Sequence, residues 1–171
     1  CASPALMEIH ELSAVDLARA LKAREVSSRE AVEALFARAD EVDGAVNALT
    51  HRFADDALTA ADAADRLRGR TKDPGPLLGM PVTIKESIAI AGRPQTLGIP
   101  GRVQNVPGHD AVTVRVLREL GAVVIGQTNV SQTLLFNESD NPVYGRTNNP
   151  WNLDRTCGGS SGGEGAAIAA G

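Results

Sequence analysis

The chain has 171 residues, of which 43% are hydrophobic and 22% charged, the balance of a globular domain able to bury a core. Its 17 basic and 21 acidic residues give a formal net charge of −4. This charge argues against nucleic acid or an anionic membrane surface as a partner. Aromatic residues make up only 3%, too few for a platform that stacks bases.

Cysteines are sparse, and no apolar run approaches the roughly 20 residues that span a bilayer. Cys1 and Cys157 form no disulfide framework, which favours a reducing compartment, and we expect a cytoplasmic protein without a membrane span. The chain does not open with Met, so Met7 is a plausible natural start, and the meaning of Cys1 stays open. Residues 166–171 resemble a helix that has barely begun, which predicts a truncated chain, a fragment.

Residues 1–70 are predicted to be helical. Ser-x-x-Asp at Ser13 and Ser-x-x-Glu at Ser27 resemble capping boxes ahead of two helices. Gly44 is the expected end of the second helix. The alanine-rich segment 55–68 predicts a third helix. We interpret the charged residues of these helices as solvated faces with no chemistry.

Residues 71–171 change in character after Asp73-Pro74-Gly75-Pro76. Short β-branched runs predict three strands, at residues 81–84, 88–90 and 122–125. Asp110 is the expected N-cap of a helix to Leu120 that carries an apolar stripe of Val112, Val116 and Leu120. Another short helix is expected from Thr128 or Asn129 to Phe136, followed by a loop over 137–149. This alternation predicts an α/β fold with a helix-covered sheet.

Lys85 ends the apolar strand Val82-Thr83-Ile84. Burial disfavours a charged ammonium group, so a lysine in this position can act as a neutral base. The simpler interpretation is that Lys85 extends to solvent or pairs with Glu86.

Residues 158–165, GGSSGGEG, place four glycines around Ser160 and Ser161 and lead into a helix of small residues. Such a segment lets backbone N–H groups approach a ligand closely, or it is a flexible linker. A phosphate-binding loop is disfavoured, because Glu164 stands where that motif has its lysine.

Cys157 raises the alternative of a thiol nucleophile, but His10, His51 and His109 form no local motif with it. A small buried cysteine is the preferred interpretation. The histidines have no metal-ligand spacing, so no metal is expected.

Together, four segments resemble the amidase signature family: residues 79–86 (GMPVTIKE), 126–129 (GQTN), 141–151 (NPVYGRTNNPW) and 158–163 (GGSSGG). They span about half of the chain, in the family's order and spacing. The resemblance implies an α/β fold with a mixed sheet surrounded by helices. Residues 1–171 would then be the N-terminal part of one amidase domain, with a helical region at 1–70 and the start of the α/β core at 71–171.

The resemblance also implies amide hydrolysis through a Ser–cis-Ser–Lys triad and an acyl-enzyme, without a cofactor. Lys85 would be the triad lysine, and Ser160 the bridging serine after a cis peptide bond. Ser161 would support them by hydrogen bonding. The family's nucleophilic serine lies in a second Gly-Gly-Ser motif farther downstream, so we expect it beyond residue 171. The chain by itself is therefore predicted to be inactive.

Departures from the common family pattern indicate a branch. Glu86-Ser87 follows the lysine, Gln127 precedes Thr-Asn, and Glu164 follows the Gly-Gly pair. Residues 128–132 (TNVSQ) and 162–166 (GGEGA) resemble the fatty-acid-amide-hydrolase branch, for which Leu134 is a candidate acyl-pocket residue, the alternative being plain core. A small-molecule amide is the expected partner, with a possible homodimer. Two other functions stay open: an A-type amidotransferase component, which acts on glutamine, and a non-catalytic Gly-loop binding module.

Overall fold

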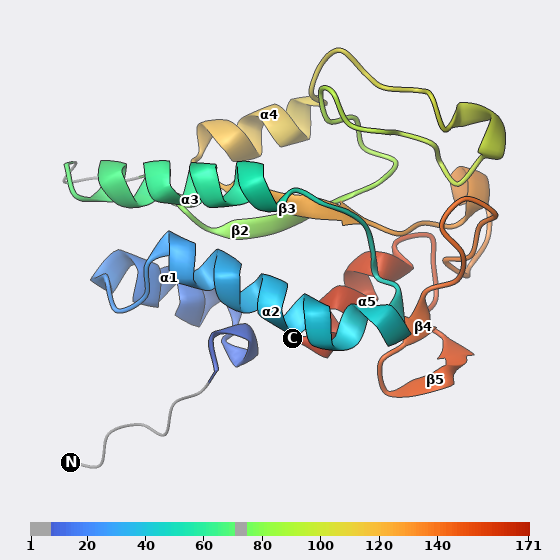
Figure 1. Ribbon diagram of the computed structural model, residues 1–171, viewed down its shortest axis with the longest axis horizontal. Helices are drawn as coiled ribbons and strands as arrows, with labels where there is room; N and C mark the ends of the chain where they lie inside the picture. Colours follow the sequence, from blue (N-terminus) through green and yellow to red (C-terminus); the bar gives the residue numbers. More distant parts are fainter. Residues whose placement is uncertain (1–7, 71–74) are drawn as a thin grey trace.

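A three-stranded mixed sheet in the order β1-β3-β2 organises the fold, and helices cover both of its faces (Figure 1). The structure is a computed structural model that describes residues 8–70 and 75–171; the expectations for Cys1, Met7 and Asp73-Pro74 lie outside these ranges. The helices are α1 (Ala14–Ala23), α2 (Ser28–Val46), α3 (Ala54–Arg68), α4 (Val112–Glu119) and α5 (Gly162–Ala170). The strands are β1 (Leu49–Arg52), β2 (Pro81–Lys85), β3 (Val123–Thr128), β4 (Asn148–Asn149) and β5 (Asn152–Thr156).

The capping residues start the first two helices as predicted. Ser13 accepts a hydrogen bond from the backbone N–H of Asp16, and Ser27 forms a complete capping box with Glu30. The end predicted at Gly44 is wrong, because α2 continues to Val46. Asn47 ends it in the left-handed conformation (φ 56°), which asparagine tolerates better than most residues.

Two predictions for this part of the chain are wrong: the strand at residues 88–90 and the helix from Thr128 or Asn129 to Phe136. Residues 88–90 form no strand, because the chain turns at once: the N–H of Ile88 donates to the carbonyl of Lys85. Ile90 is nevertheless buried, so its apolar character reflects packing and not strand pairing. In place of a helix through Phe136, a short 3-10 turn covers Gln132–Leu134, and Thr128 belongs to β3.

Helix α4 buries a different face from the one that the sequence predicts. Val114 is fully buried, whereas Val112 is 65% exposed. Val116 and Leu120 also lie on the exposed side. Asp110 does not cap this helix, because its carboxylate accepts the N–H of Ala91 and holds the preceding loop.

Strand β3 is the centre of the core, and all six of its residues are buried. Its side chains alternate between the two faces of the sheet. Val123 and Ile125 pack against α2 and α3, through Val32, Ala57 and Ala61. Val124 points to the other face and packs against Val114 of α4. Strand β2 runs parallel to β3 and β1 runs antiparallel, which confirms the mixed α/β sheet.

Helix α5 approaches the sheet closely at its first turn. A Cβ atom on Gly163 would lie 2.3 Å from the backbone nitrogen of Asn129 and 2.6 Å from the carbonyl oxygen of Ala48. Both contacts are with backbone, which cannot yield as a flexible side chain does. A Cβ on Gly165, two residues later in the same helix, would meet nothing within 4 Å.

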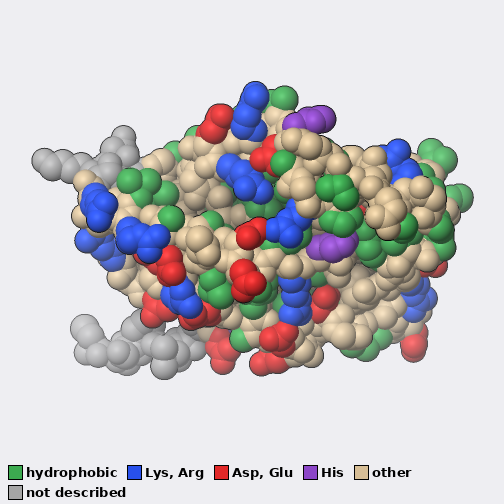
Figure 2. Space-filling view, turned by 45° about the horizontal axis from the view of Figure 1, so that its top comes forward, with side chains coloured by type: hydrophobic (Ala, Val, Ile, Leu, Met, Phe, Trp, Pro, Cys, Tyr) green, Lys and Arg blue, Asp and Glu red, His purple; other side chains and the backbone are tan. Residues whose placement is uncertain are grey.

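The surface carries charges of both signs. On the face in Figure 2, acidic and basic side chains are intermingled, with acidic side chains gathered along the lower edge of the view. No helix in the described residues is long and apolar enough to cross a membrane.

Gly163→Ala is expected to lower the free energy of unfolding by about 1–3 kcal/mol, because the added methyl group overpacks a backbone contact. Gly165→Ala is the matched control and should raise it by roughly 0.5–1 kcal/mol, because alanine favours the helix. Denaturant titration followed by circular dichroism measures both values. Equal effects of the two substitutions would contradict the close approach of α5.

Candidate functional site

Lys85 ends β2, where it lies opposite Thr128 in the parallel pairing with β3. Its side chain is half-buried. The Nζ atom donates hydrogen bonds to the hydroxyls of Ser160 and Ser161, each at 2.8 Å. The three residues that the sequence singles out therefore meet, although about 75 residues separate the lysine from the serines.

Glu86 follows Lys85 but does not pair with it. Its carboxylate is fully buried and accepts the N–H groups of Thr96 and Leu97, the latter at 3.0 Å. It also accepts the hydroxyl of Tyr144 at 3.2 Å. Burial, with a contribution from Glu86, raises the pKa of Tyr144 to about 12. Glu86 thus joins the loops that carry Thr96 and Tyr144 to the end of β2. Lys85 instead contacts Ser160 and Ser161.

The glycine-rich segment holds its serines through backbone contacts on both sides. The peptide bond between Gly159 and Ser160 is cis. The N–H of Ser131 donates to the carbonyl of Ser160 at 3.4 Å. In the first turn of α5, Gly162 donates its N–H to the Ser139 hydroxyl at 2.8 Å. Gly163 likewise donates to the carbonyl of Asn129 at 3.2 Å, so neither N–H group is available to a phosphate.

A buried amide network supports this arrangement. The Nδ2 group of Asn129 donates to the carbonyl of Gly145 and to the hydroxyl of Thr147, each at 3.0 Å. Asn141 donates to the Oδ1 atom of Asn129 at 2.8 Å. The network fixes the chain after β3, which in turn contacts the glycine-rich segment. The sequence predicts only a loop over 137–149, and the polar residues of that loop are the one signal that points to a buried role.

Cys157 and the histidines do not form a nucleophilic site. The Cys157 thiol packs against Val46, Ala48 and Ala166, and burial raises its pKa, which disfavours the reactive thiolate. His51 contacts the ring of Tyr144 edge-on, and burial lowers its pKa. Among the described residues, no cluster of His, Cys, Asp or Glu could hold a metal ion.

Leu134 lies in the 3-10 turn after β3, in the left-handed conformation (φ 64°). It is 37% exposed and therefore is not a core residue. Leu135 and Phe136 beside it are still more exposed. The hydrogen bonds of Lys85 go to Ser160 and Ser161 and do not test the role of Leu134. The acyl-pocket role of Leu134 stays a prediction.

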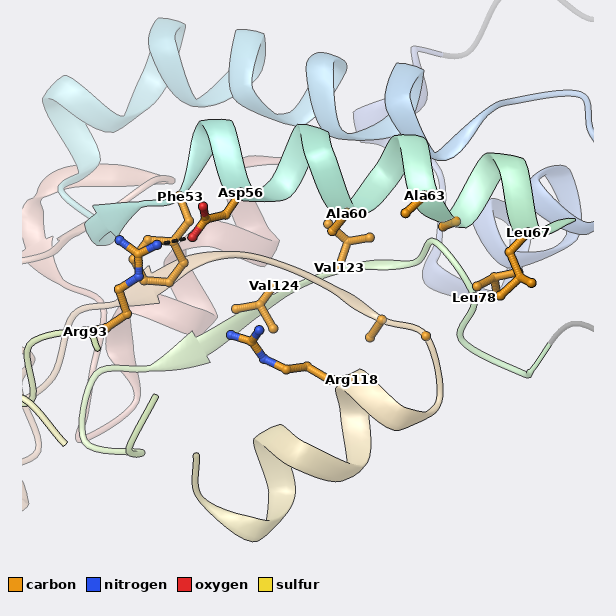
Figure 3. A pocket seen from close by; sticks show the side chains of 13 residues that line it. Phe53, Asp56, Ala60, Ala63, Leu67, Leu78, Arg93, Arg118, Val123 and Val124 are labelled. Atoms are coloured by element: carbon orange, nitrogen blue, oxygen red, sulfur yellow. Dashed lines mark hydrogen bonds and ion pairs between the residues drawn. The ribbon is translucent and has the colours of Figure 1, made fainter. Parts of the chain in front are cut away.

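A groove of about 330 Å³ lies between α3 and α4, and its lining does not include Lys85, Ser160 or Ser161 (Figure 3). Alanines of α3 and Val123 and Val124 of β3 form its walls. Arg93 lies over the ring of Phe53, at 4.3 Å from its centroid, and pairs with Asp56. The groove thus contains neither Lys85 nor the serines, and its Arg93 guanidinium group is already paired.

Comparisons with known proteins agree with these motifs. The family model described as Amidase matches residues 30–171. The chain is 43% identical over 163 residues to indoleacetamide hydrolase of Bradyrhizobium diazoefficiens, covering 95% of the chain and 31% of that protein. It is 40% identical to the A subunit of the glutamyl-tRNA(Gln) amidotransferase of Moorella thermoacetica, covering 96% and 34%.

A solved structure of a fatty acid amide hydrolase superposes with a TM-score of 0.90 and 35% identity, over 99% of this chain and 30% of that one. The chain thus spans about a third of the length of the proteins that it matches. Within that third, the family match contains Lys85, Ser160 and Ser161. The chain therefore belongs to the amidase family, the amidase signature enzymes.

Proposed function

We propose that the protein to which this chain belongs hydrolyses the C–N bond of a small-molecule amide. Lys85 and Ser160 would form a proton relay, and a serine beyond residue 171 would be the nucleophile. The observation that carries the proposal is the 2.8 Å hydrogen bond between the Lys85 amine and the Ser160 hydroxyl. An amine in contact with a hydroxyl can activate a serine without a histidine.

The relay moves one proton in each direction. In its neutral form, Lys85 takes the proton of Ser160 while Ser160 takes that of the nucleophilic serine, whose oxygen then attacks the amide carbonyl. The resulting ammonium returns the proton through Ser160 to the leaving amine, and the C–N bond breaks to give an acyl-enzyme. Water, activated by the same relay, releases the acid. No cofactor enters this scheme.

The supporting contacts suit this role. The second hydrogen bond of Lys85, to Ser161, fixes the direction of the amine. Ser131 and Asn129 hold the segment that carries both serines. Leu134 stays the candidate for an acyl pocket, and the cytoplasmic location and the homodimer stay predictions.

An amidotransferase component of the A type, which acts on glutamine, is the second candidate, because a protein of that name is 40% identical to this chain. Glutaminase activity, together with co-purification of partner subunits, would favour it. A Gly-loop binding module is disfavoured, because Gly162 and Gly163 donate their N–H groups within the chain. Thermal stabilisation by ATP or phosphate, about 2.7 kcal/mol at 100 times Kd, would support that module instead.

Lys85→Ala and Ser160→Ala in the complete protein are each expected to lower kcat for a simple aryl amide by roughly 10²–10⁴-fold, because each removes one member of the relay. Lys22→Ala, which removes an exposed lysine of α1, is the control and should leave kcat unchanged. Steady-state assays measure these values. Near-normal kcat for Lys85→Ala would refute the relay.

Ser161→Ala is expected to be milder, lowering kcat by about 10–100-fold, because Lys85 loses one hydrogen bond but keeps Ser160. Ser87→Ala is the control, since the hydrogen bonds of Lys85 within the described residues go to Ser160 and Ser161. A loss as large as that of Ser160→Ala would instead assign Ser161 to the relay.

The 171-residue chain alone is expected to give no turnover, because the proposed nucleophile and its oxyanion donors lie outside it. An aryl amide assay of the isolated chain, beside the complete protein, measures this. Turnover by the chain that Lys85→Ala abolishes would show that residues 1–171 supply their own nucleophile.

A further inference from the structure

Glu86 carries a fully buried carboxylate that the proposed relay does not use. It directly follows Lys85, and its backbone N–H donates to the carbonyl of Thr128 at 3.0 Å, next to the pairing of β2 with β3. Its carboxylate oxygens accept the N–H groups of Thr96 and Leu97. A carboxylate is costly to bury unless hydrogen bonds compensate for the lost water. The carboxylate and these two N–H groups therefore hold one another in place.

From Leu97, further hydrogen bonds lead to the glycine-rich segment. The carbonyl of Leu97 accepts the N–H of Thr133 at 2.9 Å. Thr133 lies in the 3-10 turn that follows Ser131, and the N–H of Ser131 donates to the carbonyl of Ser160 at 3.4 Å. The hydroxyl of Ser160 accepts the amine of Lys85 at 2.8 Å. These contacts form a closed ring, which leaves the lysine through the next residue of the chain and returns to it through the serine.

Two residues of this ring have backbone conformations that need support. Leu97 and Thr133 both have φ 55°, in the left-handed region that is uncommon for residues other than glycine and most unusual for a β-branched one. Arg24 and Asn47 share this conformation, but they end α-helices, where it is ordinary. Leu97 and Thr133 are held instead by the Glu86 carboxylate and by the hydrogen bond between them. Such conformations persist only where surrounding contacts enforce them.

We propose that Glu86 is a positioning residue, whose carboxylate keeps the Ser160 hydroxyl at hydrogen-bond distance from the Lys85 amine. This inference rests on the relay proposed above. Glu86 acts through the backbone: on the lysine as its neighbour at the end of β2, and on the serine through Leu97 and the turn after β3. A relay passes a proton only between groups in hydrogen-bond contact, so a small displacement of the serine lowers the rate strongly.

The test is a double-mutant cycle on kcat in the complete protein, with a simple aryl amide as substrate. Glu86→Gln replaces one accepting oxygen by an NH₂ group, which cannot accept a backbone N–H. It is expected to lower kcat about 10–100-fold and to change KM less than about threefold, because the loosened ring misplaces the relay rather than the substrate. In a Lys85→Ala background the same substitution should cost less than about threefold, because the position of the serine matters little without the lysine.

Tyr144→Phe is the matched control. It removes the hydroxyl that donates to the same carboxylate at 3.2 Å and leaves the contact of that carboxylate with Leu97 in place. Its kcat should stay within about threefold of the wild-type value, because the ring remains closed. Thermal unfolding followed by circular dichroism shows how far each variant is destabilised, separately from its kcat.

The outcomes separate positioning from a purely structural role. A loss in Glu86→Gln that is equally large with and without Lys85 makes Glu86 merely structural and overturns the proposal. An unchanged kcat in Glu86→Gln also overturns it, as does a loss of the same size in Tyr144→Phe. Near-normal activity of Lys85→Ala refutes the relay itself, whatever Glu86 does. If Glu86→Gln does not fold, Glu86→Asp, with a carboxylate one methylene closer to the backbone, is carried through the same cycle and judged by the same criteria.

Discussion

The parallel pairing of β2 with β3 is the constraint on which the site depends. It places Lys85 opposite Thr128, and the next residues of that chain, Asn129 and Ser131, hold Gly163 and Ser160. The serines therefore lie next to the lysine, because the residues that hold them directly follow the β3 position that pairs with Lys85. A shift of one residue in this register would turn the side chain of Lys85 to the opposite face of the sheet.

Lys85 and Glu86 show how a strand end separates two opposite charges. They are adjacent in sequence, yet one amine contacts hydroxyls in a half-buried position and one carboxylate is fully buried among N–H and O–H donors. A buried carboxylate without such donors would be strongly unfavourable, so the loops around Thr96 and Tyr144 depend on Glu86 as much as it depends on them. The pairing of Lys85 with Glu86, the simplest expectation from sequence, does not form.

The sequence predicts the elements that depend on local signals. The capping residues Ser13 and Ser27, the apolar strand before Lys85 and the glycine-rich segment all carry their information within a few residues. The errors arise where long-range packing decides. Strand β1 is short and polar, and exists because β3 offers it a partner. Ile90 and Val114 are buried together in one cluster, which periodicity does not reveal.

Similarly, motifs identify the site residues but not the residues that support them. Asn129, Asn141 and Thr147 look like loop residues in sequence, because side-chain amides favour turns as well as buried networks. Their role becomes visible only when the loop folds back over the end of β3. The N-cap of α5 is a similar case, since the Ser161 hydroxyl accepts the amine of Lys85 and no backbone N–H of the helix.

The β4–β5 hairpin places the chain's one tryptophan in solvent, because Trp151 is 85% exposed at the turn. The one tyrosine, Tyr144, is instead joined to the buried carboxylate of Glu86. The two fluorophores therefore report on different regions. Tryptophan emission reports on the surroundings of the hairpin and is expected to change little when the core unfolds. The phenol absorbance of Tyr144 is expected to change when its contact with the buried carboxylate of Glu86 is lost.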